Sequence, residues 1–414
     1  MILHLFRLVW NRRRANALVM IEILVCFLAL CVVLTSAVRF SSRWNEPIGF
    51  KYKDVWQVQP RMGAFTQSSE EQRLVMKQSL AQLESGTSQH PEVETVALCA
   101  NAPFSNNSDS QTIFIDGKRH GLLVTKSSLS LKALLELELV DGRWIEDADE
   151  ALAWTPMVIA EKTAESLFPD SNPLGERFPS FNREGQRVDY DDLEPEDRGK
   201  DYRVVGIMKN IRRNGEVGTP VHVAFVPADL KSAHSYPPTN LLIKVRPGTT
   251  AQFEVKLLKS LHALQPEWSF QVSTLEQRRR SVLRIHLLPL AIGSVVATAL
   301  ISMVGMGLVG VLWQNVGRRT SELGLRRALG ATARQVQFQI MGELGALATI
   351  SLLIGTIIFL QAPFLFPDLK LSWNECLLGL ALSALVTGIF VSACSFYPSW
   401  LASRIQPSQA LQYE

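Results

Sequence analysis

Four long runs of apolar residues interrupt an otherwise mixed chain. Each run is long enough to cross a hydrocarbon core of about 30 Å as a helix. The sequence therefore predicts a membrane protein with four transmembrane α-helices and with both chain ends on one side of the membrane. The predicted spans are residues 18–38, 286–316, 336–362 and 376–396.

The stretch between the first two spans, residues 39–285, has the pattern of a soluble domain. Short strand-like runs alternate with helical patterns without a repeating βαβ rhythm, which favours a large α+β domain. The acidic stretch from Asn182 to Lys200 is interpreted as a solvated loop, because it lacks the spacing of a calcium-binding EF-hand. The predicted strands are Asp54 to Gln59, Val93 to Cys99, Thr112 to Asp116, Pro156 to Ala160, Tyr202 to Met208, Val221 to Val226 and Leu241 to Val245, and the predicted helices are Ser69 to Glu84, Glu161 to Phe168 and Ala251 to Leu264.

Basic residues in the short loops set the expected orientation. Residues 317–335 carry five arginines, whereas residues 367–375 carry only Lys370 against Asp368 and Glu375. Basic short loops favour the cytoplasmic side, while long domains cross largely regardless of their charge. We therefore expect an extracytoplasmic α+β domain over residues 39–285. The predicted cytoplasmic parts are residues 1–17, 317–335 and 397–414, and residues 363–375 form a predicted short outer loop.

The first apolar run has a second interpretation, a signal peptide cleaved after Thr35-Ser36-Ala37. Its apolar core is unusually long for a signal peptide, so a membrane anchor is preferred. Glu22 lies about one turn inside this span. A carboxylate within a membrane is a candidate functional group, but near the edge it can also reach water or pair with Arg13 or Arg14.

The loop between the second and third spans predicts a short charged helix. Glu322 lies in its first turn and Arg326 and Arg327 lie in its last turn, which suits the helix dipole. Gly330 is placed to end this helix, and Thr332 then begins a capping box with Gln335. Leu325, Ala328 and Leu329 share one face. The helix is interpreted as a docking element; the alternative is a basic helix that rests on anionic headgroups.

Three parts of the sequence carry a family resemblance. The run Arg319 to Ala333 resembles the coupling segment of MacB/FtsX-type ABC permeases, close to R-T-x-E-I-G-I-R-R-A-L-G-A-T, with Leu in place of Ile at Leu323 and Leu325. The last stretch, Tyr397 to Leu411, resembles the family's Y-P-A-x-x-A-A-R-x-x-P-x-x-A-L ending. Within the soluble region, landmarks of MacB-type extracytoplasmic domains follow in order: Asp141-Gly142-Arg143-Trp144, Pro156 to Glu161, Leu167-Phe168, Asn172-Pro173-Leu174-Gly175 and Tyr202 to Ile207.

The resemblance implies the transmembrane permease subunit of an ABC transporter. Such a subunit passes ATP-driven motion of an ATPase to its extracytoplasmic domain, for efflux, export or envelope remodelling. No ATPase sequence is fused here, so a separate ATPase subunit is expected to bind ATP and Mg, with no cofactor in this chain. A second permease copy or a related permease, membrane lipids, and a periplasmic adaptor or outer-membrane protein are further expected partners in the bacterial inner membrane. The implied ATPase-coupling residues are Arg319, Glu322, Leu325, Arg326, Arg327 and Leu329.

Composition and motifs change this picture little. The net charge of +3 is too small to indicate nucleic-acid binding. The chain has no phosphate loop, no zinc-type histidine pattern and no G-x-S-x-G elbow, so no catalytic or metal-binding residues are predicted. Cys99 is the one cysteine in the soluble region, which implies no disulfide framework. The alternative function is an ATP-independent membrane receptor or scaffold with an extracytoplasmic ligand-binding domain.

Two further features concern how the spans pack and end. Ser294, Thr298, Ser302 and Gly305 form a small-residue stripe for dimer packing, with packing inside one subunit as the alternative. A second stripe is formed by Gly379, Ser383 and Thr387. The helical pattern of the second span extends back to Thr274, which predicts a stalk helix of about 58 Å to Leu312, with a kink at Pro289. The residues expected on its solvated and headgroup-facing surface are Arg278, Arg279, Arg280 and Arg284.

Overall fold

The computed structural model divides into two compact units, residues 45–285 and residues 1–44 with 286–414. We call the first the sheet unit and the second the helical unit, and each is described by itself. The structure describes residues 13–62, 70–105, 110–115, 117–181, 186–188, 191, 201–231, 236–318, 325–326, 329–366 and 371–403.

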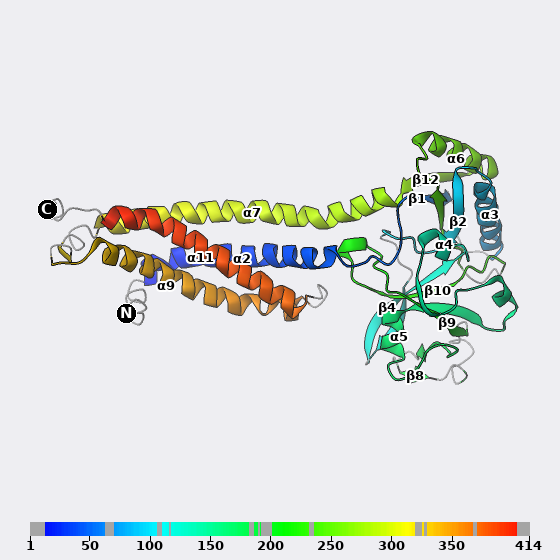
Figure 1. Ribbon diagram of the computed structural model, residues 1–414, viewed down its shortest axis with the longest axis horizontal. Helices are drawn as coiled ribbons and strands as arrows, with labels where there is room; N and C mark the ends of the chain where they lie inside the picture. Colours follow the sequence, from blue (N-terminus) through cyan, green and yellow to red (C-terminus); the bar gives the residue numbers. More distant parts are fainter. Residues whose placement is uncertain are drawn as a thin grey trace. The chain divides into compact units, whose positions relative to one another are not determined.

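The helical unit contains the membrane-spanning helices (Figure 1). Four helices of the described residues are long and apolar enough to cross a membrane, which confirms the expected fold class. The candidate spans run over Ala17–Trp44, Leu275–Gln314, Ala333–Leu365 and Trp373–Trp400. They belong to α2 (Arg13–Trp44), α7 (Leu275–Arg318), α9 (Ala333–Phe359) with the short α10 (Ala362–Leu365), and α11 (Trp373–Ser403).

Small residues allow these helices to approach one another closely. A Cβ atom added at Gly379 of α11 would lie 2.0 Å from Thr35 Oγ1 of α2, and one added at Gly355 of α9 would lie 2.5 Å from Phe27. Ser383 and Thr387 are also buried. The second small-residue stripe therefore packs within the chain, where close backbone approach substitutes for the missing hydrophobic force between helices in lipid.

The sheet unit is built on one ten-stranded mixed sheet. Its order is β12-β1-β11-β2-β4-β10-β6-β9-β5, with β3 paired to β4, and β4/β10 and β6/β9 are parallel pairs. A separate two-stranded sheet pairs β7 with β8. The strands are β1 (Val55–Met62), β2 (Val93–Cys99), β3 (Ser110–Ile115), β4 (Lys118–Ser127), β5 (Leu139–Gly142), β6 (Thr155–Ala160), β7 (Ser180–Phe181), β8 (Arg187–Val188), β9 (Tyr202–Met208), β10 (His222–Pro227), β11 (Asn240–Val245) and β12 (Trp268–Thr274).

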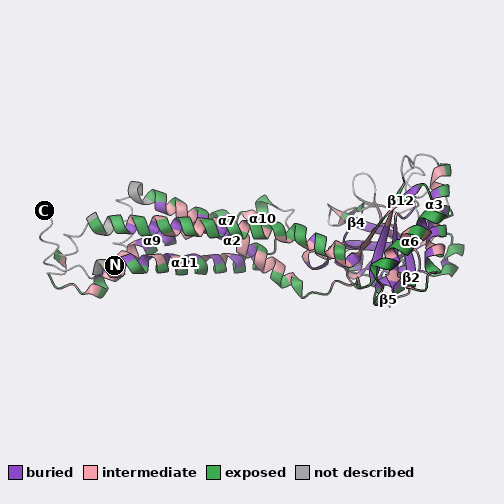
Figure 2. Cartoon of the chain, turned by 90° about the horizontal axis from the view of Figure 1, so that it is seen from above, coloured by how far each residue is buried: buried purple, intermediate pink, exposed green. Residues whose placement is uncertain are grey.

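Helices cover this sheet and enclose buried cores (Figure 2). Trp56 and Val58 of β1 join one core with apolar residues of α3 and α6, whereas Gln57 and Gln59 alternate with them and point to the other face. That other face includes a second core, to which Leu275 and Val282 of α7 contribute. The helices are α3 (Glu70–Ser88), α4 (Leu131–Leu135), α5 (Glu161–Leu167) and α6 (Ala251–Leu264), with 3₁₀ turns η1 (Asp147–Ala151) and η3 (Gly215–Val217).

The predicted strands and helices are confirmed within a few residues, but β4, β5, β7, β8, β12 and the short α4 were missed. β4 begins with Lys118, Arg119 and His120, so its apolar part is short and the alternation is masked. β12 carries polar residues between its aromatic ones, and α7 follows it directly, so no turn residues mark where the strand ends. Strands whose outward face is polar therefore give the weakest sequence signal.

We expect Gly206→Ala to destabilise the sheet unit by about 1–3 kcal/mol. A Cβ atom there would lie 2.2 Å from the Arg143 carbonyl oxygen, so the β5 and β9 backbones would have to separate. Gly121→Ala is the matched control, since its Cβ would meet Ser110 at an ordinary 3.7 Å. Urea-dependent proteolysis of the full chain in detergent measures both; equal stability of the two variants would contradict this packing.

Candidate functional site

The predicted coupling segment is described at only three of its six named residues. Arg319, Glu322 and Arg327 lie outside the described residues. The side chains of Leu325 and Leu329 are 53% and 79% exposed, which leaves apolar surface uncovered. Arg326 donates from Nη1 to Gln339 Oε1 of α9 at 2.7 Å. Their role in docking stays a prediction.

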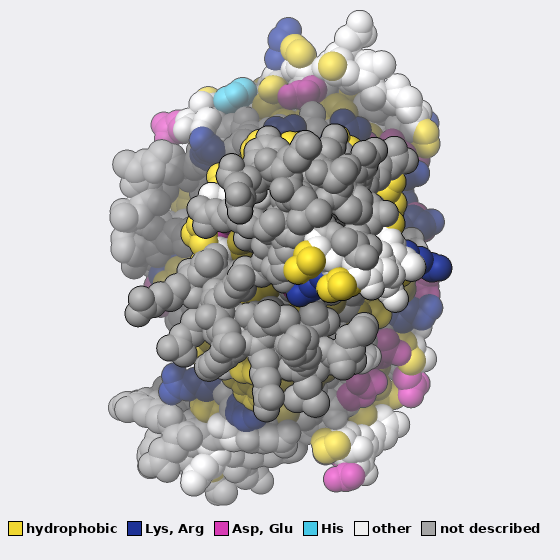
Figure 3. Space-filling model, turned by 90° about the vertical axis from the view of Figure 1, so that its left-hand side faces the viewer, with side chains coloured by type: hydrophobic (Ala, Val, Ile, Leu, Met, Phe, Trp, Pro, Cys, Tyr) yellow, Lys and Arg dark blue, Asp and Glu magenta, His cyan; other side chains and the backbone are white. Residues whose placement is uncertain are grey.

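The C-terminal end of this segment and the start of α9 have the predicted capping geometry. Gly330 has φ +100°, and the Ala331 amide donates to the Arg326 carbonyl at 3.0 Å, which is the long bond of a Schellman motif. Thr332 then caps α9, since its Oγ1 accepts from the Gln335 amide and the Gln335 side chain accepts from the Thr332 amide. A helix stop therefore leads directly into a helix start. Figure 3 views the end of the helical unit that carries this segment, and hydrophobic side chains reach the surface there.

The predicted dimer stripe on α7 divides into two parts. Ser294, Thr298 and Ser302 are exposed, and each hydroxyl donates to the carbonyl four residues earlier, so they present a small, low-polarity surface. Gly305 instead faces α11, because a Cβ there would lie 2.9 Å from Phe390. Only the first three residues therefore remain available to a second subunit.

Glu22 of α2 lies against α7. A Cβ atom at Gly307 would lie 2.8 Å from Glu22 Oε2, so the carboxylate of this flexible side chain lies directly beside the glycine. The expected partners Arg13 and Arg14 have side chains outside the described residues.

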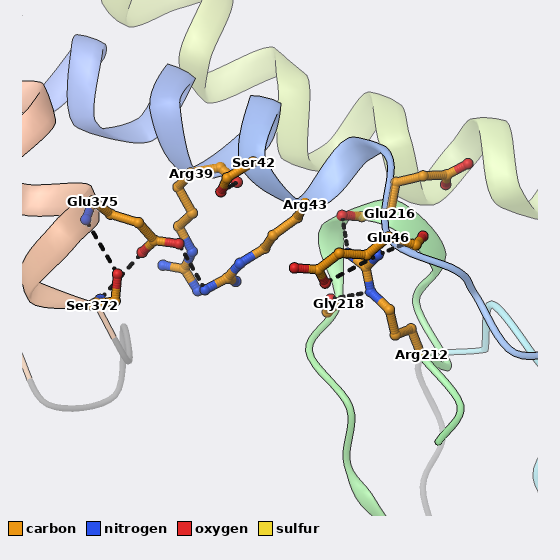
Figure 4. A network of polar contacts seen from close by, with 9 residues as sticks. All are labelled: Arg39, Ser42, Arg43, Glu46, Arg212, Glu216, Gly218, Ser372 and Glu375. Carbon is orange, nitrogen blue, oxygen red and sulfur yellow. Dashed lines mark hydrogen bonds and ion pairs between the residues drawn. The ribbon is translucent and has the colours of Figure 1, made fainter. Parts of the chain in front are cut away.

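A buried arginine ties the segment that enters the sheet unit to η3 (Figure 4). Arg212 is 1% exposed, and its backbone amide donates to the Ile48 carbonyl at 2.8 Å. Its Nη1 donates to the Glu46 carbonyl at 3.0 Å, and its Nη2 donates to the Glu216 carbonyl at 2.6 Å. Its Nε donates to the Gly218 carbonyl at 2.9 Å. Neutral carbonyls thus accept hydrogen bonds from all three nitrogens of this buried guanidinium, and the Glu46 carboxylate lies 3.5 Å from its Nη1.

The same 3₁₀ turn holds the first turns of α7. The Glu216 carboxylate accepts from Arg279 Nε at 2.9 Å and also forms an ion pair with Arg279 Nη2. The guanidinium lies over the Tyr52 ring at 5.2 Å from its centroid. We call Arg212, Glu216 and Arg279 the η3 clamp. It joins the entering segment and the departing helix of the sheet unit through one short turn.

This geometry corrects one expectation for the stalk. Arg280 and Arg284 are exposed as expected, but Arg279 is packed against Glu216 rather than solvated. Arg278 is partly buried and donates to Ser273 and Gln59. The sequence could not reveal these partners, because Glu216 and Arg212 lie in an irregular loop whose contacts are distant in sequence.

A separate polar contact fixes the end of α2 within the helical unit (Figure 4). Arg43 forms an ion pair with Glu375 at 3.1 Å, and the two side chains are 12% and 10% exposed. Glu375 also caps α11, since its Oε2 accepts from the Ser372 amide at 3.2 Å. The Glu375 carboxylate thus caps the first turn of α11 and forms an ion pair with α2.

We expect Glu216→Gln and Arg279→Gln each to destabilise the sheet unit by about 3 kcal/mol, because each leaves a poorly hydrated charge without its partner. The double variant should lose much less than the sum of the two, which a double-mutant cycle of urea-dependent proteolysis measures. Arg280→Gln is the control, since that side chain is 75% exposed and 4.0 Å from Glu276. Additive losses would show that the pair does not act as a unit.

Comparison with known proteins places both units in one family. Residues 17–258 match the family model of the MacB-like periplasmic core domain, and residues 279–407 match that of the FtsX-like permease C-terminal domain. The chain is 24% identical over 316 residues to the macrolide export ATP-binding/permease protein MacB of Marinobacter nauticus, covering 73% of this chain and 45% of that relative. It is 24% identical over 291 residues to the uncharacterized ABC transporter permease YknZ of Bacillus subtilis, covering 67% of this chain and 66% of YknZ.

Similarity to one of the solved structures is weak. The crystal structure of the periplasmic region of MacB from Actinobacillus actinomycetemcomitans has a TM-score of 0.38 and 13% identity, covering 58% of this chain and 97% of that one. The chain spans about half the length of the MacB relative from Marinobacter nauticus. The first family model alone covers more than half of the 414 residues. The chain belongs to the MacB/FtsX-type family of ABC transporter permeases.

Proposed function

We propose that this permease passes ATP-driven motion from a separate ABC ATPase, docked at residues 317–335, to the sheet unit. The work done there is export or envelope remodelling. The observation that carries the proposal is the continuity of α7, which runs unbroken from Leu275 to Arg318. At 1.5 Å per residue its 44 residues make a rod of about 66 Å. One element therefore begins in the sheet unit and ends at the coupling segment.

The start of α7 is held firmly in the sheet unit. Thr274 and Gln277 form a capping box, with each side chain accepting from the other's backbone amide at 3.0 Å. Leu275 is fully buried and Val282 is 6% exposed in the core. The η3 clamp adds an ion pair through Arg279. A helix anchored by a cap, a core and an ion pair moves with the domain that holds it.

Pro289 lies inside α7 without ending it. Proline has no amide hydrogen, so the Ile285 carbonyl lacks its usual helical partner at this point. We propose that α7 bends at this turn and still transmits a push.

The proposed orientation follows the arginine-rich loop. Residues 317–335 and both chain ends lie in the cytoplasm of a bacterial cell, and the sheet unit lies on the outer side of the inner membrane. ATP and Mg bind the ATPase, and this chain contributes no catalytic residue. A second permease, identical or related, packs on the Ser294, Thr298 and Ser302 stripe. A periplasmic adaptor or outer-membrane protein can then extend the export pathway beyond the inner membrane.

The orientation predicts opposite labelling at two introduced cysteines. In a variant without the five native cysteines, Asp191→Cys should react with an impermeant maleimide in intact spheroplasts, since Asp191 is 73% exposed. Ser321→Cys should react only after permeabilisation. Labelling of Ser321→Cys alone in intact spheroplasts would reverse the topology.

Docking predicts that Glu322→Lys with Leu325→Asp loses the ATPase on purification while the permease still inserts. Charge-assisted contacts contribute about 1.5–3 kcal/mol each, so losing one and burying a charge should lower the affinity at least tenfold. Glu254→Lys with Val255→Asp is the control, because it makes the same charge changes on α6, with an exposed aliphatic residue, Val255 (56% exposed), replaced by Asp. Undiminished co-purification of the first variant would favour the ATP-independent receptor instead.

Ser281→Pro should leave insertion and ATPase binding intact but abolish transport. Proline at this position removes a helical hydrogen bond to Gln277 within the anchored part of α7. ATP hydrolysis by the complex should continue without work. Ser281→Ala is the control for loss of the hydroxyl, which donates only to the Gln277 carbonyl. Wild-type transport by a normally expressed Ser281→Pro variant would show that α7 does not carry the stroke.

A further inference from the structure

A polar cavity of about 450 Å³ lies in the sheet unit beside the first turns of α7. Its volume falls in the range of small-molecule binding sites. The strand wall consists of Gln59 from β1 and of Gln271 and Ser273 from β12. The helix wall includes Arg278, and apolar surface comes from Phe104 and Ile285. The lining therefore combines neutral hydrogen-bonding groups, the Arg278 cation and a small apolar patch, and Arg61 of β1 donates to the lining residue Gln271 at its Oε1 at 2.7 Å.

The polar wall follows from strand alternation. On β1 and β12 the aromatic and aliphatic side chains point into the core shared with α3 and α6, so the residues between them face the other way. Gln59 lies directly opposite Gln271 in the antiparallel register, which brings the two amides side by side. This polar sheet face would be open to water, but the start of α7 forms a wall beside it.

Arg278 is the unusual member of this cavity. Its Nε donates to Ser273 Oγ at 2.8 Å and its Nη2 donates to Gln59 Oε1 at 3.2 Å, both neutral acceptors. Among the described residues no carboxylate forms an ion pair with it, whereas Arg279 pairs with Glu216. A guanidinium has five N–H donors, so three remain after these two bonds. A partly buried cation oriented by neutral groups is ready for an external anion.

We propose that this cavity binds a small organic carboxylate, with Arg278 as the residue that recognises the charge. Guanidinium and carboxylate have matching planar geometry, and a charge-assisted pair offsets the cost of holding Arg278 away from water. Gln59 and Gln271 hydrogen-bond amide or hydroxyl groups of the ligand, and Phe104 with Ile285 contact an apolar substituent. Arg278 is the charged residue of the lining, whereas the Arg61 guanidinium is already bound to Gln271 Oε1, so a singly charged carboxylate is favoured over a phosphate. Binding is independent of the proposed ATP-driven function.

The test compares N-acetyl-leucine with N-acetyl-leucinamide, which differ only in the carboxylate. Isothermal titration of the full chain in detergent without ATP should give at least tenfold tighter binding of the acid. Arg278→Gln should remove this preference while leaving the weak amide binding unchanged. Gln271→Ala should weaken both probes together. Inorganic phosphate at equal concentration should not displace the acid.

Arg280→Gln is the matched control, since it removes a charge two positions away on an exposed side chain paired with Glu276. It should keep the acid preference, and thermal unfolding checks that each variant folds. Equal binding of the two probes, no binding of either, or an unchanged preference in Arg278→Gln would overturn the proposal. Displacement by phosphate as strong as that by the acid would overturn the assignment to carboxylates. The Glu322→Lys with Leu325→Asp variant should bind the acid normally, which separates this result from failure of ATPase docking.

Discussion

The η3 clamp is the contact on which the rest of this account depends. Arg212 is fully buried, and its guanidinium donates to backbone carbonyls of the entering segment and of η3. Glu216 of the same turn forms an ion pair with Arg279 of α7. A buried cation held by carbonyls tolerates little displacement, because every lost hydrogen bond leaves charge unsolvated. The two chain connections of the sheet unit are therefore fixed to one short turn rather than to separate loops.

In the proposed function, firm attachment of α7 to the sheet unit is what allows the helix to transmit motion. A rod of about 66 Å transmits motion only if both ends are held. Its start is capped by Thr274 and Gln277 and buried at Leu275, and its other end leads to the arginine-rich segment. Arg43 and Glu46 are three positions apart, and each is held by a polar contact within its own unit. The end of α2 is thus held by Arg43 within the helical unit, and the chain just after α2 is held by Glu46 within the sheet unit.

The sequence predicted the elements better than the contacts between them. Local signals were enough for several features. Hydropathy predicts the four spans, and capping residues with a positive-φ glycine predict that α7 starts after Thr274, that one helix ends at Gly330 and that α9 starts after Thr332. The η3 clamp and the Arg278 cavity depend on residues separated by long stretches of chain, and no periodicity marks them. Arg279 was expected in solvent for this reason: a run of arginines is usually a solvated face, and only the fold brings Glu216 beside it.

Hydrogen exchange of the permease assembled with its ATPase tests the central claim most directly. If α7 and the clamp move as one body, addition of ATP should change the protection of the Gly215–Gly218 amides together with that of the first turns of α7. The amides of α5, on a different part of the sheet unit, should stay unchanged. A change confined to residues 317–335, with η3 and the start of α7 unaffected, would contradict the account.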